Sequence, residues 1–235
     1  MMAPFLTYNL ALVLAAVIPS VYLLVKVYRS DRLEPESPHI LWVQFRSGIL
    51  SALIALVSER IFSQVLYAYV DSSSLLYRVL LYFVVVAVSE EGAKHFMLRK
   101  SSWNSPEFNC LYDGIIYAVF VSLGFATWEN ISYVTHYGFG TALIRSFTAI
   151  PGHASFGVFM GVFYSAARLS SRYGDNSKAK TYQFLSVLVP VLIHGTYDYI
   201  ATAEGGTVYF FVFIAILFIT SSKVINSISK SDRYI

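Results

Sequence analysis

Long apolar stretches separated by short polar segments occupy most of the chain. Each stretch has about the 20 residues that carry a helix across the hydrocarbon core of a bilayer. The pattern predicts helices over residues 4–27, 39–58, 76–98, 112–134, 141–167, 181–202 and 207–224. We therefore predict an all-α fold, a polytopic membrane helical bundle of about seven transmembrane helices, forming a single integral-membrane domain over residues 1–235.

The connection over residues 59–75 is ambiguous. Residues 62–70 are apolar but too few to span a bilayer. This segment either lengthens the second helix or lies in the membrane interface.

Composition agrees with a membrane protein. The chain is 56% hydrophobic and 13% charged, with a mean hydropathy of +0.58, whereas a soluble domain carries about 25% charged residues. We therefore expect a multi-pass protein of the cell membrane. The net charge of +3 is too small to indicate a nucleic-acid partner, and the single cysteine, Cys110, excludes an intrachain disulfide.

The distribution of Lys and Arg predicts the orientation. Basic residues recur on alternate connections: Lys26, Arg29 and Arg32; Lys94, Arg99 and Lys100; Arg168, Arg172, Lys178 and Lys180; Lys223, Lys230 and Arg233. The opposite side has Arg60, Arg78 and Arg145. Because cytoplasmic connections are enriched in Lys and Arg, we predict that the N-terminus is outside and the C-terminus is cytoplasmic.

Two predicted helices carry small residues at four-residue spacing. They are Gly114, Ala118, Ser122 and Ala126 in the fourth helix, and Gly157, Gly161 and Ser165 in the fifth. Such stripes permit close approach of helix backbones in a membrane. Asn130 and His153 continue these stripes in register, so we expect both side chains to face the bundle.

Polar residues interrupt several apolar stretches. Ser89, Glu90 and Glu91 follow directly on the apolar run 80–88. A charged side chain inside a bilayer costs at least roughly 2.5–3.5 kcal/mol on insertion scales, so it usually has a partner or a task. Later helices add further polar side chains: Glu129, Asn130, His153, His194 and Asp198.

Helical rise shows whether these groups can meet. Counted from the predicted cytoplasmic ends, Glu129 lies roughly 25 Å up its helix, and His153 and His194 lie roughly 20 Å up theirs. Glu90 reaches a similar depth, roughly 20 Å, only if its helix continues to Trp103. On that condition we expect one shared cavity.

Local spacing suggests different roles for the two adjacent glutamates. Lys94 is four residues after Glu90 and three after Glu91, so it can neutralise one of them. The two glutamates point about 100° apart on a helix, which argues against the same role for both. His194 and Asp198, at i and i+4, suit an imidazole oriented by a carboxylate.

These residues together resemble the PrsW family of intramembrane proteases, which is related to the CAAX prenyl proteases and their bacterial relatives. The resemblance covers about residues 28–200, with a motif-bearing core at about 76–202. Its motifs are Glu90-Glu91-x-x-Lys94, Phe125-x-x-x-Glu129-Asn130, His153-x-x-x-Gly157 and His194-x-x-x-Asp198, together with the loop Asp31-Arg32-Leu33-Glu34-Pro35-Glu36. The loop departs from the family pattern at Ser37, and the CAAX relatives have histidine where this chain has Glu129.

The resemblance implies hydrolysis of a peptide bond in or beside the membrane. It also implies a membrane-anchored protein substrate, of the kind represented by anti-sigma factors cleaved at site 1. The simplest mechanism makes Glu90 the general base for water. Glu91 then pairs with Lys94 or aligns the water, while His153 and His194 stabilise the tetrahedral intermediate. Glu129 and Asn130 shape the cavity or hold the scissile backbone, and Asp198 orients His194.

Two alternatives remain open. The first is a zinc-dependent protease that uses His153, His194 and a carboxylate from Glu90, Glu129 or Asp198, because two histidines and a carboxylate form a hydrolytic zinc site. We favour the mechanism without a metal or other cofactor, since no His-Glu-x-x-His motif is present. The second alternative is a proton-coupled transporter, because intramembrane acids and histidines also form proton relays.

Overall fold

The computed structural model describes residues 2–235, with side chains from Leu12 onward, and Met1 lies outside the described residues. Helices form most of this part of the chain, and Cys110 and Tyr234 form an isolated β-bridge. The helices are α1 (Met2–Tyr28), α2 (Pro38–Tyr69), α3 (Leu75–Val79), the π-helix η1 (Leu80–Val86), α4 (Ala87–Ser102), α5 (Asp113–Tyr137), α6 (Phe139–Phe147), α7 (Ala149–Arg172), α8 (Asn176–Thr202) and α9 (Thr207–Lys230).

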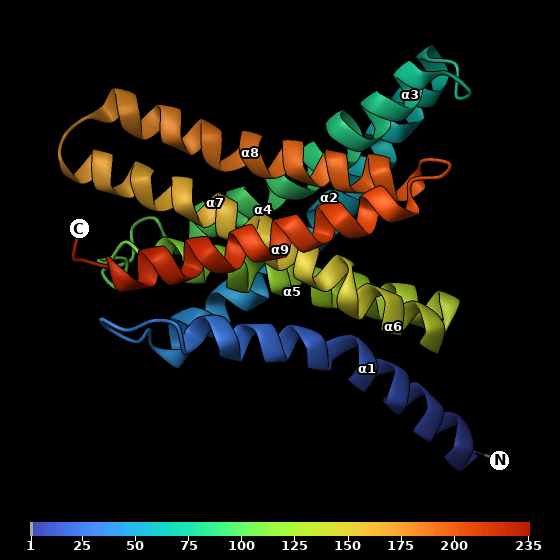
Figure 1. Ribbon diagram of the computed structural model, residues 1–235, viewed down its shortest axis with the longest axis horizontal. Helices are drawn as coiled ribbons and strands as arrows, with labels where there is room; N and C mark the ends of the chain where they lie inside the picture. The colour runs from blue at the N-terminus through green and yellow to red at the C-terminus, as the bar shows by residue number, and fades with distance from the viewer. Residues whose placement is uncertain (1) are drawn as a thin grey trace.

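The helices run roughly along one axis, and the two ends of the chain lie at opposite ends of the bundle (Figure 1). Because α3, η1 and α4 are continuous and α6 leads directly into α7, the described elements form seven helical segments. Among the described residues, α2, α5, α8 and α9 are long and apolar enough to cross a membrane, and Leu12–Tyr28 is a shorter apolar helix. The predicted all-α membrane bundle is confirmed.

Helix α5 lies at the centre and packs against α1, α2 and α7. The predicted small-residue stripes form its contact with α7. A Cβ added at Gly161 would lie 2.6 Å from the carbonyl oxygen of Gly114, and one added at Gly157 would lie 2.8 Å from Ser122 Oγ. Since real Cβ atoms do not approach so closely, these glycines let α7 touch the backbone of α5.

Two boundaries resolve questions that the sequence left open. Helix α2 continues to Tyr69, so the apolar part of the 59–75 connection lengthens the second helix. Helix α4 continues to Ser102, which meets the condition for bringing Glu90 to the depth of the histidines. The sequence did not indicate η1, the π-helix just before the glutamate pair. The ring of Phe83 in η1 packs on α8 where Gly195 has no side chain.

The prediction of one helix over 141–167 is wrong. Gly138, with a φ of 82°, separates α5 from α6, and Thr148 separates α6 from α7. Pro151 is the third residue of α7, in the first turn, where a missing N–H leaves no helical bond unmade. The chain therefore breaks before the proline and α7 begins afresh, with His153 in its second turn.

Candidate active site

A cavity of about 440 Å³ opens between α2, η1, α4, α5, α6, α7 and α8. Its size is within the range of small-molecule and cofactor sites. Apolar side chains form much of the wall, and seven ionisable side chains also line it: Glu59, Glu90, Glu129, Arg145, His153, His194 and Asp198. The structure thus brings the sequence-predicted acids and histidines to one place.

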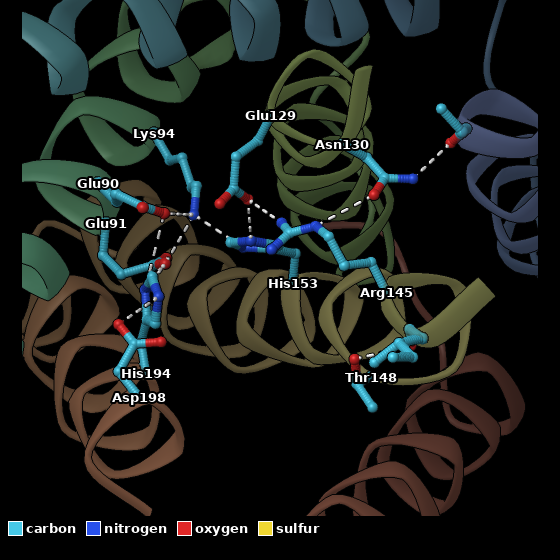
Figure 2. A network of polar contacts seen from close by, with 12 residues as sticks. Glu90, Glu91, Lys94, Glu129, Asn130, Arg145, Thr148, His153, His194 and Asp198 are labelled. Atoms are coloured by element: carbon cyan, nitrogen blue, oxygen red, sulfur yellow. Dashed lines mark hydrogen bonds and ion pairs between the residues drawn. The ribbon is translucent and has the colours of Figure 1, made fainter. Parts of the chain in front are cut away.

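Lys94 lies at the centre of the polar network beside this cavity (Figure 2). Its fully buried ammonium group donates to Glu91 Oε1 at 2.8 Å and to Glu90 Oε2 at 3.1 Å. The same nitrogen lies 3.1 Å from His153 Nδ1 and 3.9 Å from the centre of the Phe125 ring. The prediction that Lys94 neutralises one glutamate is therefore too narrow, because it contacts both.

The two adjacent glutamates have different surroundings, as their angular separation predicted. Glu90 lines the cavity, and 8% of its side chain is exposed. The Glu91 side chain is 0% exposed, and its Oε1 also lies 2.9 Å from His194 Nδ1. Glu90 therefore faces the space where a substrate would lie, whereas Glu91 fixes Lys94 and His194.

His194 lies between carboxylates from two helices. Its Nδ1 donates to Glu91 Oε1 at 2.9 Å, and its Nε2 lies 3.4 Å from Asp198 Oδ2 (Figure 2). The i,i+4 arrangement predicted for His194 and Asp198 is present. The contact with Asp198 is the longer of the two, and both residues line the cavity. Nε2 is thus the ring nitrogen of His194 with the longer contact to its partner.

His153 connects Lys94 to a second ion pair. An ammonium group has no lone pair, so Lys94 donates to His153 Nδ1, and the ring hydrogen is on Nε2. Nε2 donates to Glu129 Oε2 at 2.9 Å, and Arg145 Nη2 lies 2.8 Å from the same oxygen. Arg145 Nε donates to Asn130 Oδ1 at 3.1 Å.

Asn130 faces the bundle, as the small-residue stripe predicted, and it forms hydrogen bonds between helices. Its side chain is fully buried, and its amide nitrogen donates to the carbonyl oxygen of Ala16 at 3.0 Å. Both ends of the amide are therefore engaged, one with α1 and the other with Arg145 on α6. Asn130 holds helices together and does not line the cavity, so it is not placed to hold a scissile backbone.

The donor atoms were tested for their fit to a metal ion. One donor atom each from Glu90, Glu91 and His153 lie within 4.8 Å of one another, close enough to surround an ion. However, the Lys94 ammonium contacts all three side chains and occupies the space between them. The second candidate set consists of His153, His194 and a carboxylate. In it, both histidines direct their ring nitrogens at Lys94 or at carboxylates. In this arrangement the Lys94 ammonium takes the donor atoms that an ion would need.

Sequence reasoning missed two residues of the cavity wall. Arg145 was interpreted as an orientation marker, yet it turns inward, and Glu59 lies on the extension of α2 that the sequence left unassigned. A signal existed for both. A charge within or beside an apolar stretch predicts a partner at membrane depth, and that rule was applied only to the motif-bearing acids.

The fold and the cavity define a class of protein. A multi-pass helical bundle surrounds a polar cavity in which a glutamate, two histidines and a lysine lie within contact distance. Such a set supplies a base for water and donors for an oxyanion, which are the requirements of a hydrolase.

Comparison with known proteins identifies the family. Residues 36–221 match the PrsW family intramembrane metalloproteases, and the chain belongs to this family. Protease PrsW of Bacillus subtilis (strain 168) is 32% identical over 200 residues, covering 85% of this chain and 87% of that protein. Protease PrsW of Geobacillus kaustophilus (strain HTA426) is 33% identical over 194 residues, covering 83% of this chain and 81% of that protein.

A longer alignment supports the same assignment. Protease PrsW of Shouchella clausii (strain KSM-K16) is 29% identical over 226 residues, covering 95% of this chain and 98% of that protein. No solved structure matches. The chain is therefore an intramembrane protease and a multi-pass membrane protein. Membership of this family argues against the proton-coupled transporter that the sequence alone left open.

Proposed function

We propose that this protease is an endopeptidase of the glutamate type, in which Glu90 activates the hydrolytic water. The observation that carries the proposal is the separation of the two glutamates, because Glu90 faces the cavity while Glu91 is fully buried against Lys94 and His194. A general base must be within hydrogen-bond reach of the proton that it removes. Of the pair, Glu90 alone lines the cavity.

The proposed reaction adds one water across the peptide bond. Glu90 takes a proton from water while the water oxygen bonds to the carbonyl carbon, giving a tetrahedral intermediate with a negative oxygen. Glu90 then gives its proton to the amide nitrogen as the C–N bond breaks. The products are a carboxyl group and an amine, and the carboxylate of Glu90 is regenerated.

The histidines stabilise the intermediate in this proposal. His194 is the better placed of the two, since its Nε2 is 3.4 Å from Asp198 in the cavity wall. A developing oxyanion would compete for that hydrogen, whereas Glu91 on Nδ1 keeps the ring in position. His153 contributes from the other side of Lys94. A preorganised donor of this kind is worth about 10²–10³ in rate.

We further propose a membrane-anchored protein as substrate, with an anti-sigma-factor-like protein as the class that the sequence resemblance implies. The cavity lies among spanning helices, so a scissile bond would enter from within or beside the bilayer. Its volume of about 440 Å³ suits a short peptide segment rather than a folded domain.

The zinc-dependent alternative is favoured by one observation, the close grouping of donors from Glu90, Glu91 and His153. Against it stands the ammonium group of Lys94 in the same space. The two mechanisms differ in what a chelator does. A metal-free enzyme keeps its activity after chelation, while a zinc enzyme loses activity and regains it with added zinc.

The test uses purified full-length protein in proteoliposomes with a single-span anti-sigma factor as probe. We expect two fragments by mass spectrometry, a rate unchanged by EDTA, and no stoichiometric zinc by elemental analysis. Loss of activity with EDTA and its return with zinc would contradict the glutamate mechanism. Absence of cleavage by intact, folded protein across a panel of single-span substrates would contradict the substrate class.

A further inference from the structure

Arg145 enters the cavity from a helix whose large apolar side chains face outward. On α6 the large apolar side chains Phe139, Leu143, Ile144 and Phe147 are exposed. Arg145 turns the other way, lines the cavity, and leaves only 16% of its side chain exposed. A charged side chain turned away from the apolar face of a membrane helix is expected to have a partner or a function.

Three neighbouring side chains of α5 hold the guanidinium in place, and Figure 2 shows two of them, Glu129 and Asn130. Nη2 lies 2.8 Å from Glu129 Oε2, and Nε donates to Asn130 Oδ1 at 3.1 Å. The plane lies over the Tyr133 ring, 3.9 Å from its centre. Asn130 is itself fixed to the carbonyl of Ala16 on α1. Contacts along two edges and one face leave the guanidinium little freedom. The planar, rigid guanidinium group is suited to such simultaneous hydrogen bonding and stacking.

The contact with Glu129 extends to the reacting groups. Glu129 Oε2 accepts from Arg145 and lies 2.9 Å from His153 Nε2, so the ring hydrogen is on Nε2 and points at Glu129. That leaves the lone pair of Nδ1 to accept from Lys94 Nζ at 3.1 Å. The remaining hydrogens of Lys94 go to Glu90 and Glu91.

From this geometry we propose that Arg145 is a positioning residue of the protease. By holding Glu129, it keeps the acceptor of the His153 Nε2 hydrogen in place and so supports the tautomer in which Nδ1 accepts from Lys94. This inference rests on the proposed function, since it assigns Arg145 to the mechanism that uses Glu90. Residues that orient a functional histidine through its second nitrogen set the tautomer and ring direction in other enzymes as well.

The tautomer is the first readout, because it does not depend on activity. In protein with ¹⁵N-labelled histidine, the ring nitrogen shifts of His153, assigned with His153→Gln, should show the Nε2–H form in wild type. In Arg145→Gln that form should lose its dominance, whereas Arg145→Lys, which keeps a cation near Glu129, should retain more of it. Arg60→Gln is the matched control, because Arg60 is an exposed residue outside the cavity wall.

Kinetics give the second readout. We expect Arg145→Gln to lower kcat by about 10–100-fold with little change in KM, as loss of an orienting partner does. Arg145→Lys should recover part of that loss. The double variant Arg145→Gln with Glu129→Gln should be no slower than Glu129→Gln alone, because both act through one contact.

Two outcomes would overturn the inference. One is a wild-type kcat and a wild-type His153 tautomer in folded Arg145→Gln. The other is a double variant whose loss is the product of the single losses. If Arg145→Gln does not fold, Arg145→Lys and Glu129→Gln answer the same question. Failure of the proposed function is recognised separately, by full activity of Glu90→Gln, which leaves the tautomer unaffected.

Discussion

Replacement of Lys94 by methionine removes a buried ammonium group while keeping a side chain of similar length. The ammonium contacts Glu91 at 2.8 Å and Glu90 at 3.1 Å, and these carboxyl side chains are 0% and 8% exposed. Breaking a buried ion pair by removing one partner costs about 3–5 kcal/mol, because it leaves an uncompensated charge. His194 still lies 2.9 Å from Glu91, so we expect the lower end, about 3 kcal/mol.

The assay is equilibrium unfolding of the purified variant in detergent micelles, with Lys180→Met as control because Lys180 is exposed on α8. A second substitution, Glu90→Gln in the Lys94→Met background, removes one of the two orphaned charges. It should recover about 1–2 kcal/mol, since residues in one network couple by 0.5–3 kcal/mol. Unfolding of Lys94→Met at the wild-type midpoint would refute the reasoning, as would a double variant less stable than the single one.

Other consequences can be measured on different parts of the molecule. Burial raises the pKa of Glu36, in the loop before α2, to about 9. The folded state then holds a proton that the unfolded state releases near pH 4.5. The free energy of unfolding therefore falls as pH rises from about 4.5 to 9, by at most about 1.4 kcal/mol per pH unit. Glu36→Gln should flatten this slope in unfolding titrations. Gly161→Leu should destabilise the α5–α7 contact by at least about 1–3 kcal/mol, because even a Cβ would lie 2.6 Å from the Gly114 carbonyl; a wild-type melting temperature would contradict that contact. Reporters fused after Ile235 and at Gly138 should read cytoplasmic and outside respectively, and the reverse pattern would contradict the predicted orientation.

The sequence predicted much of the fold because membrane helices depend on local properties. Apolar length indicated the number of helices, and four-residue spacing of small residues identified the packing faces of α5 and α7. The convergence of Glu90, His153 and His194 followed from helical rise once the helix of Glu90 was extended toward Trp103. These features can be predicted without knowing which helices are neighbours, so one amino-acid sequence was enough to predict them.

The remaining features depend on tertiary contacts. The π-helix η1 accompanies packing of Phe83 on Gly195, a contact between segments more than a hundred residues apart. Arg145 turns inward because Glu129 and Asn130 on α5 offer it acceptors. The same contact engages the Asn130 side chain, which does not line the cavity. Patterns along one helix do not report such pairings between helices.

The catalytic role of Glu90 is tested most directly by the hydrolysis rate of purified Glu90→Gln protein in proteoliposomes, measured against wild type and against Glu204→Gln. Glu204 is exposed in the loop after α8, so its substitution controls for the loss of one carboxylate. We predict that Glu90→Gln lowers the rate by at least about a hundredfold, the low end for a general base, while Glu204→Gln is unaffected. A folded Glu90→Gln protein that cleaves at the wild-type rate would contradict the mechanism.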